Sequence, residues 1–162
     1  MSGFLHLSDF HLVEDETASS RAFNANYILK NTINKILDKK ENFGNLDGVI
    51  ITGDISDDGS TASYSDAYNI IKELNLPLLA IPGNHDLRQP MMNYFAKDID
   101  VQSSGFFDWV YETSDTLIIG LDTLVEGQNH GMLRPESLNL LFESLNQPTE
   151  KNIILAIHHP PI

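Results

Sequence analysis

Four short groups of polar side chains could together bind metal ions. Each group directly follows a run of apolar residues, which is the pattern of a buried strand that ends at the rim of a sheet. The groups are Asp9 and His11; Asp54; Asn84, His85 and Asp86; and His158 and His159. Carboxylates, imidazoles and amides are ligands that divalent transition metals accept. The pattern predicts that the four groups converge on one shared metal site.

The run that ends at Asp54 is the most regular of the four. Residues 49–52 are Val-Ile-Ile-Thr, and Gly53 separates them from the carboxylate. Glycine has no side chain, so another group can approach the backbone closely at this point. Taken alone this motif is weak, because many buried strands end in Gly-Asp at a turn. Its weight comes from the ligand-type residues that follow the other strands.

Asp9 and His11 are separated by one residue, which places both side chains on the same side of an extended segment. A carboxylate and an imidazole in that arrangement can bind one metal ion. The alternative is a solvated loop in which Asp and His occur by chance. Asp57 and Asp58 are interpreted as residues that solvate a loop or cap the next helix, with direct metal binding as the less favoured alternative.

Strands and helices alternate over the first half of the chain. The expected elements are strands at 4–7, 46–52 and 78–81, with helices at 21–40 and 61–74. Strand–helix–strand units imply a parallel sheet with right-handed crossovers. Functional sites in such sheets collect at the carboxyl ends of the strands. Three independent segments agree with this rule, because ligand-type side chains follow all three strands.

The second half of the chain predicts a different arrangement. The expected elements are a short helix at 89–96, antiparallel strands at 106–111 and 116–121, a helix at 135–145 and a buried strand at 152–157. Asp122 is interpreted as a turn residue and His130 as a solvent-exposed loop residue. No repeat, low-complexity segment or linker interrupts the sequence, so residues 1–162 are expected to form one domain.

The composition is that of an ordinary soluble globular protein, with 162 residues, 41% apolar and 20% charged. The formal net charge of −13 at pH 7 argues against binding to nucleic-acid polymers or anionic membranes. Neither a membrane span nor a signal peptide is recognisable, so a cytoplasmic location is expected. The chain has no cysteine, so any metal must be held by His, Asp, Asn or water.

These motifs, in this order, resemble those of the calcineurin-like metallophosphoesterases. The resemblance rests on Asp9 with His11, Gly53 with Asp54, residues 83–86 (Gly-Asn-His-Asp) and residues 158–161 (His-His-Pro-Pro). The flanking residues are similar to the branch of bacterial cyclic-nucleotide and glycerophosphodiester phosphodiesterases. The resemblance implies a four-layer α/β/β/α sandwich. It also implies hydrolysis of a small-molecule phosphoester by a hydroxide that two divalent cations (Mn, Fe or Zn) generate.

The resemblance assigns a role to each ligand-type residue. The metal ligands would be Asp9 and His11 for the first cation, Asp54 for both cations, and Asn84 and His158 for the second. The family ligand is the His that is followed by one residue and then Pro, which favours His158 over His159.

His85 would contact the phosphate and assist the leaving group rather than bind metal. Asn84 would lie beside it at the substrate, and Asp86 would orient the imidazole. A purely structural His85, satisfied by protein partners, is the alternative interpretation.

One motif of the family does not occur in this sequence. The family pattern places a Gly-His-x-His segment after His158, with one more imidazole for each cation, and the chain ends at Ile162 without it. The expected sandwich is therefore truncated before its last strands. Two functions remain open: a phosphodiesterase, in this form or within a longer protein, or a degenerate, non-catalytic metal-binding or interaction domain. Exposed edges would favour association into a homo-oligomer.

Overall fold

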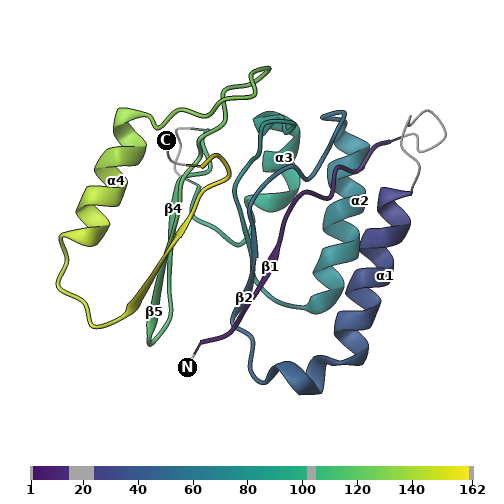
Figure 1. Cartoon of the computed structure of the whole chain (residues 1–162), viewed down its shortest axis with the longest axis horizontal. Coiled ribbons are helices and arrows are strands. Elements are labelled where there is room, and N and C mark those ends of the chain that lie inside the picture. Colours follow the sequence, from purple (N-terminus) through teal and green to yellow (C-terminus); the bar gives the residue numbers. More distant parts are fainter. Residues whose placement is uncertain (1, 15–23, 102–104, 161–162) are drawn as a thin grey trace.

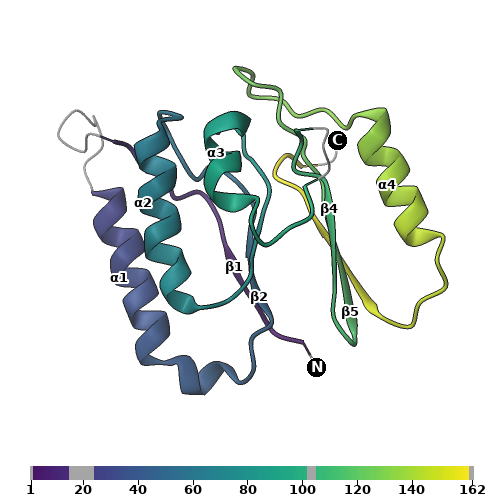
Figure 2. The same cartoon turned by 180° about the vertical axis from the view of Figure 1, so that it is seen from behind.

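Two β-sheets lie face to face in the middle of the protein, and helices cover their outer sides (Figure 1, Figure 2). The computed structural model describes residues 2–14, 24–101 and 105–160. One outer layer holds α1 (Ala25–Asp38), α2 (Thr61–Ile71) and α3 (Arg88–Phe95), and the other holds α4 (Pro135–Leu145). This order of layers confirms the α/β/β/α sandwich that the sequence implies.

The first sheet is parallel throughout. Its strands are β1 (Phe4–Leu7), β2 (Gly48–Ile51) and β3 (Leu78–Ala80), in that order. Leu5 pairs with Val49, and Val49 pairs with Leu78. All residues of β2 and β3 are buried, which explains why these strands are continuous apolar runs in the sequence. The parallel pairing brings the carboxyl ends of the three strands to one edge of the sheet.

Helices α1 and α2 connect these strands and bury one face each. The buried side chains recur at helical spacing and include Leu29 and Ile33 in α1 and Ala67 and Ile71 in α2. Each helix begins at a side-chain cap: Asn24 accepts from the Tyr27 N–H, and Ser60 accepts from the Ser63 N–H. Among the described residues, no helix combines the length and the apolar character that crossing a membrane requires.

The second sheet is mixed. Its strands are β4 (Trp109–Glu112), β5 (Thr116–Gly120) and β6 (Asn152–Ala156), in that order. The pairing of β4 with β5 is antiparallel, as expected, and that of β5 with β6 is parallel. Leu117 and Ile119 of β5 pack against α4, whereas Ile118 joins the core between the sheets. The Trp109 indole Nε1–H crosses that core and donates to the Ala80 carbonyl at 2.7 Å, which joins the two sheets.

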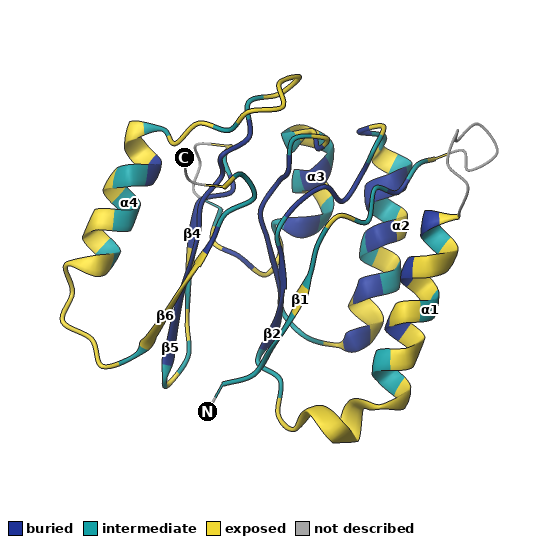
Figure 3. Cartoon of the chain, in the orientation of Figure 1, coloured by how far each residue is buried: buried dark blue, intermediate teal, exposed yellow. Residues whose placement is uncertain are grey.

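Strand β6 is exposed, which corrects the expectation of a buried strand. Ile153, Ile154 and Leu155 are 47%, 36% and 45% exposed, and Ala156 is the buried residue of the strand (Figure 3). Within the described part of the chain β6 pairs with β5 alone, and α4 packs on side chains of β5. An apolar run thus occurs at the edge of a sheet, and periodicity alone does not distinguish that position from a central strand.

The other elements agree with the sequence expectation apart from their ends. The 3-10 helix Lys72–Leu74 forms the last turn of the second expected helix, whereas the 3-10 helix Lys40–Phe43 begins where the first expected helix was predicted to end. Residues 21–23 of the first expected helix lie outside the described residues. The expected helix at 135–145 is confirmed at both ends. The assignment of residues 1–162 to one domain stays a prediction.

Gly120 is expected to tolerate no larger residue, because it pairs with Trp109 across β4 and β5. A Cβ atom at Gly120 would lie 2.2 Å from Cε2 of the Trp109 ring. Gly120→Ala should therefore lower the free energy of unfolding by about 1–3 kcal/mol through overpacking. Urea denaturation measures the loss, with Val110→Ala at an exposed position of β4 as the control. Equal stability of Gly120→Ala and the wild type would contradict the tight contact.

Candidate metal centre

The predicted ligand groups meet at one edge of the fold. Asp9 and His11 follow β1, Asp54 follows β2, Asn84 follows β3, and His158 follows β6 of the second sheet. The first three groups are brought together by the parallel register of the first sheet. The fourth group, His158, lies near the others because the two sheets pack face to face. The arrangement forms two half-sites, each with three side chains, that share Asp54.

The first half-site consists of Asp9, His11 and Asp54. The Nε2 atom of His11 lies 3.9 Å from Oδ1 of Asp9 and 3.5 Å from Oδ2 of Asp54. The segments after β1 and β2 continue the parallel pairing, since the Asp9 N–H donates to the Gly53 carbonyl at 3.0 Å and the His11 N–H to the Asp54 carbonyl at 2.9 Å. These backbone bonds fix the distance between the three side chains. The half-site is open to solvent at Asp9, whose side chain is 57% exposed.

The second half-site consists of Asp54, Asn84 and His158. The Nε2 atom of His158 lies 3.6 Å from Oδ1 of Asp54 and 3.2 Å from Oδ1 of Asn84. The other ring nitrogen, Nδ1, lies 2.7 Å from the Thr52 carbonyl oxygen and donates its proton there. In the neutral imidazole, Nε2 then presents a lone pair to the half-site. Such a second hydrogen bond commonly orients a metal-binding histidine.

The donor atoms of both half-sites fit a cation. The facing atoms are Oδ1 of Asp9, Nε2 of His11, both carboxylate oxygens of Asp54, Oδ1 of Asn84 and Nε2 of His158. In the neutral rings all of these atoms carry lone pairs and none carries a hydrogen. Lone pairs and negative charges that face one another repel, and a bound cation removes that repulsion. Mixed oxygen and nitrogen ligands suit several divalent transition metals.

Asp54 is placed by an unusually close approach of two strand ends. Its carboxylate is buried, and Oδ1 accepts the His85 N–H at 3.0 Å. A Cβ atom at Gly53 would lie 2.4 Å from the Gly83 nitrogen, and one at Gly83 would lie 2.2 Å from Oδ1 of Asp54. Both positions therefore require glycine, and the Gly-Asp and Gly-Asn motifs are needed together.

Three of the candidate ligands have a backbone conformation that is rare for residues other than glycine. The φ angles of Asp9, His11 and Asp54 are +57°, +51° and +52°, in the left-handed region. Such conformations cost free energy and persist only where the surrounding structure requires them, and they are frequent at functional sites. All three therefore support a functional role for this edge.

Asp57 lies between His11 and His85, a position that the sequence analysis did not assign to it. Its Oδ1 lies 3.2 Å from Nδ1 of His11 and 3.0 Å from Nδ1 of His85. The two rings meet edge to face, with centroids 4.8 Å apart. Asp57 thus orients one metal-ligand candidate and the candidate catalytic histidine together. Its spacing of three residues after Asp54 was the only sequence signal, and loop aspartates are too common for that spacing to decide.

Asp86 has a different position from the one expected. Its buried carboxylate accepts from the backbone N–H groups of Ile55, Ser56 and Gly83 and from the Tyr64 hydroxyl. Burial raises the pKa of the Asp86 carboxyl, while these donors act in the opposite direction. The carboxylate beside His85 is that of Asp57, so the expected orientation of His85 by Asp86 does not match the geometry. Asp86 instead joins the loop after β3 to the loop after β2.

Four further sequence interpretations can be compared with the structure. The Nδ1 atom of His159 lies 2.8 Å from the Thr123 hydroxyl, whereas Nε2 of His158 lies 3.6 Å from Asp54, so His158 stays the predicted ligand. His130 is exposed, as expected. Asp58 accepts from the backbone N–H groups of Glu14 and Ser60, as expected for a loop residue. Asp122 was expected at a turn, but its side chain is fully buried and pairs with Arg88.

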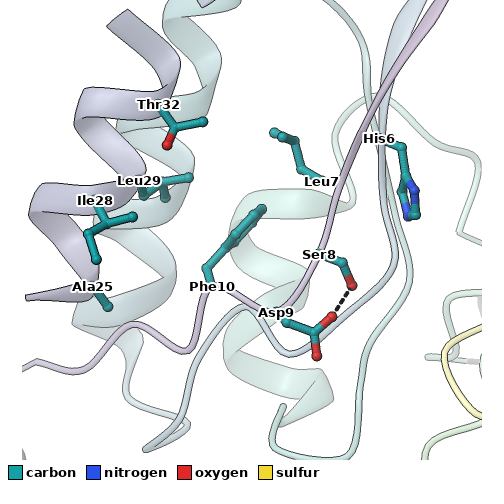
Figure 4. Close-up of a pocket in the computed structure, with 9 residues that line it drawn as sticks. All are labelled: His6, Leu7, Ser8, Asp9, Phe10, Ala25, Ile28, Leu29 and Thr32. Atoms are coloured by element: carbon teal, nitrogen blue, oxygen red, sulfur yellow. Dashed lines mark hydrogen bonds between the residues drawn. The ribbon is translucent and has the colours of Figure 1, made fainter. Parts of the chain in front are cut away.

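A cavity of about 340 Å³ borders the open side of the first half-site (Figure 4). It lies between α1 and the edge of β1 that pairs with no described strand. Its polar lining comes from His6, Ser8, Asp9 and Thr32, and its apolar lining from Leu7, Phe10 and α1 side chains. Figure 4 shows the Ser8 hydroxyl directed at the Asp9 carboxylate, to which it donates. The cavity leaves space beside Asp9 for a further group.

The family model for calcineurin-like phosphoesterases matches residues 3–162. The chain belongs to this family. The chain is 33% identical over 158 residues to the "probable glycerophosphodiester phosphodiesterase GpdQ" of Arcobacter nitrofigilis, with 98% of this chain and 57% of that protein covered. It is 31% identical over 163 residues to a "cAMP/cGMP dual specificity phosphodiesterase" of Mycobacterium tuberculosis, with 98% of this chain and 49% of that protein covered.

The chain spans about half the length of these two relatives, 57% and 49% respectively. A solved crystal structure of a Thermus thermophilus protein superimposes with a TM-score of 0.55 at 15% identity. The match covers 94% of this chain and 66% of that chain. At this identity the likeness concerns the fold, and it agrees with the four observed layers.

Mn²⁺ is expected to stabilise the protein, because a cation that binds only the folded state raises the free energy of unfolding. The gain should be about 2.7 kcal/mol at a free concentration of 100 times Kd. Asp54→Asn should lose most of this gain, because it removes the charge that both half-sites share. Urea denaturation with and without Mn²⁺ measures the difference. Asp100→Asn, at an exposed position, is the matched control and should keep the full gain; an equal gain in both variants would place the metal elsewhere.

Proposed function

We propose that this chain takes part in the metal-dependent hydrolysis of small phosphodiesters, at a dinuclear site built on Asp54. One observation carries the proposal: the two oxygens of the Asp54 carboxylate face two different imidazoles, Oδ2 towards His11 and Oδ1 towards His158. A carboxylate in this position can bridge two cations. Family membership supports the same reading, since the matching model is that of phosphoesterases.

The proposed ligands divide between the two half-sites. Asp9 and His11 bind the first cation, Asn84 and His158 bind the second, and Asp54 binds both. Two divalent cations at such a site would hold the phosphate and supply a nucleophilic hydroxide at neutral pH. They would also offset the repulsion between an anionic substrate and a protein with a formal net charge of −13. Manganese, iron and zinc all suit these ligands.

His85 is the proposed acid that serves the leaving oxygen. Its Nδ1 lies 3.0 Å from Oδ1 of Asp57, which leaves Nε2 available for a substrate atom, and its side chain is 42% exposed. Asp57 fixes the direction of the ring and compensates the charge that the ring carries when it is protonated. At Nε2 the protonated ring gives its proton to the departing alkoxide. Asn84, whose neighbour is His85, can contact the phosphate from the second half-site.

The proposed substrates are cyclic nucleotides or glycerophosphodiesters, which the names of the two relatives above mention. We also propose a cytoplasmic location, one domain over residues 1–162, and contacts between copies through the exposed edge strand β6. The exposed side chains of β6 support such contacts, because an uncovered apolar strand edge favours pairing with another chain.

A second candidate function is a metal-binding domain without turnover. It is favoured by the open first half-site, where Asp9 is 57% exposed and the described residues supply three side chains. Fewer protein ligands mean weaker binding of a cation. The cavity beside Asp9 has room for an additional ligand or for the substrate itself.

Hydrolysis of bis(p-nitrophenyl) phosphate with saturating Mn²⁺ separates the two functions. The proposed enzyme should show metal-dependent turnover. His85→Ala should lower kcat by about 10²–10⁴-fold, because it removes the proton donor, while the stabilisation by Mn²⁺ remains. His130→Ala, at an exposed loop position, should retain full activity. Absence of turnover in a protein that Mn²⁺ stabilises would favour the non-catalytic function.

Asp57→Asn tests the orientation of His85 separately. The amide keeps the size of the carboxylate but loses its charge, so kcat should fall by about 10–100-fold. Activity identical to that of the wild type would remove Asp57 from the mechanism.

A further inference from the structure

The second half-site takes its ligands from both sheets. Asn84 lies in the loop after β3 of the first sheet, and His158 follows β6 of the second. Their donor atoms lie 3.2 Å apart. Since a cation accepts only a narrow range of ligand distances, the separation of the two sheets at this edge must be held closely. The half-site therefore depends on whatever fixes the loop after β3 to the second sheet.

Arg88 spans this gap. It lies four residues after Asn84, at the start of α3, and its guanidinium forms a bidentate pair with Asp122 just beyond β5. Nε donates to Oδ2 at 2.8 Å and Nη2 donates to Oδ1 at 2.9 Å. Nη2 also donates to the Leu124 carbonyl, and the Arg88 backbone N–H donates to Glu126 at 3.0 Å. The Arg88 side chain is 16% exposed and that of Asp122 is fully buried.

Asp122 is a rigid anchor for this contact. Besides Arg88, its carboxylate accepts the N–H groups of Phe107 and Leu124, each at 3.0 Å. The Arg88 guanidinium lies over the Phe106 ring, with its carbon Cζ 4.7 Å from the ring centroid. A planar fork between a fixed carboxylate and an aromatic ring has little freedom to move. Displacement of Arg88 would therefore also displace the loop between β3 and α3, which carries Asn84.

The other side of the loop is fixed to the first sheet. Asp86 accepts N–H groups from the loop after β2, and the Leu87 N–H donates to the Tyr64 hydroxyl at 2.7 Å. Residues 84–88 are thus held from both sheets. Asp86 and Tyr64 set their position relative to Asp54, and Arg88 sets it relative to the second sheet.

We propose that Arg88 is a positioning residue that sets the distance between Asn84 and His158 and so tunes the second cation site. This inference rests on the proposed dinuclear function. The Arg88 side chain touches neither half-site, and it acts through the loop and through Asp122. Loss of the bidentate contact lets the loop and the second sheet separate, and the second cation binds more weakly while the first is unaffected.

The chain contains a matched control for a purely structural ion pair. Arg134 pairs with Asp108 and stacks on the same Phe106 ring. The guanidinium carbon Cζ lies 3.4 Å from the ring centroid. Its side chain is 15% exposed and that of Asp108 is 11% exposed, close to the values for the Arg88 pair. Arg134 precedes α4, so this pair joins two parts of the second-sheet side. Asp108 also accepts the Asp122 backbone N–H at 2.9 Å, so the pair supports the Asp122 backbone but leaves the Arg88 fork itself in place.

Calorimetric titration of the metal-free protein with Mn²⁺ tests the proposal. The wild type should bind two ions. Arg88→Lys keeps the charge but loses the planar fork, so affinity for the second ion should fall by about tenfold or more. Arg134→Lys should leave both affinities within about twofold, although both variants should melt at lower temperature. Titrations of His158→Ala and His11→Ala assign each binding step to a half-site.

The outcomes separate this inference from the proposed function. If Arg88→Lys bound both Mn²⁺ ions with the same affinities as the wild type, the positioning role would be overturned and the dinuclear site would stay intact. Equal weakening in Arg88→Lys and Arg134→Lys would also overturn it, because general destabilisation would then explain the effect. Fewer than two Mn²⁺ ions bound by the wild type would overturn the dinuclear site itself. Should Arg88→Lys not fold, Asp122→Asn takes its place with the same expected loss.

Discussion

The structure depends on how the buried Asp54 carboxylate is held between two half-sites. Its two oxygens point at imidazoles from different sheets, 3.5 Å from His11 and 3.6 Å from His158. This position is possible only because Gly53 and Gly83 let two strand ends approach more closely than side chains would allow. The first sheet supplies one half-site through its parallel register, and the packing of the sheets supplies the other. An acidic group at this point is costly to bury without compensation, which is what a bound cation provides.

The same device orients both imidazoles that face Asp54. Nδ1 of His158 donates to the Thr52 carbonyl, and Nδ1 of His11 donates to Asp57. In each ring the outer hydrogen bond fixes the proton on one nitrogen and leaves the other as a ligand. Asp57 performs this task for His85 as well, so a single carboxylate links the first half-site to the proposed acid. In the proposed function, metal binding and proton transfer would therefore be coupled through one side chain.

The ligand-type residues could be found in the sequence because each follows an apolar run, and the parallel sheet then decides where they meet. The antiparallel pairing of β4 with β5 also follows from the pattern of apolar runs and turns, whereas the four layers and the choice of His158 were implied by the resemblance to the calcineurin-like metallophosphoesterases. Side-chain direction in loops does not, which is why Asp57 was missed and why Asp86 was expected beside His85. Asp122 was interpreted as a turn residue because its partner, Arg88, is distant in sequence. The exposure of β6 depends on what covers a strand, and its apolar sequence contains no such information.

The left-handed backbone at Asp9, His11 and Asp54 has a consequence for how residues at these positions can change. Asn, Asp and His tolerate this conformation far better than β-branched residues do, so Val, Ile or Thr would be disfavoured there whatever their chemistry. The backbone conformation therefore restricts the residue types at the three positions mainly to glycine and to the small set, Asn, Asp and His, that can also ligate a metal. At positions 9 and 54 the side-chain charge can consequently be removed without changing the backbone conformation, because an amide replaces the carboxylate with little change in the path of the main chain.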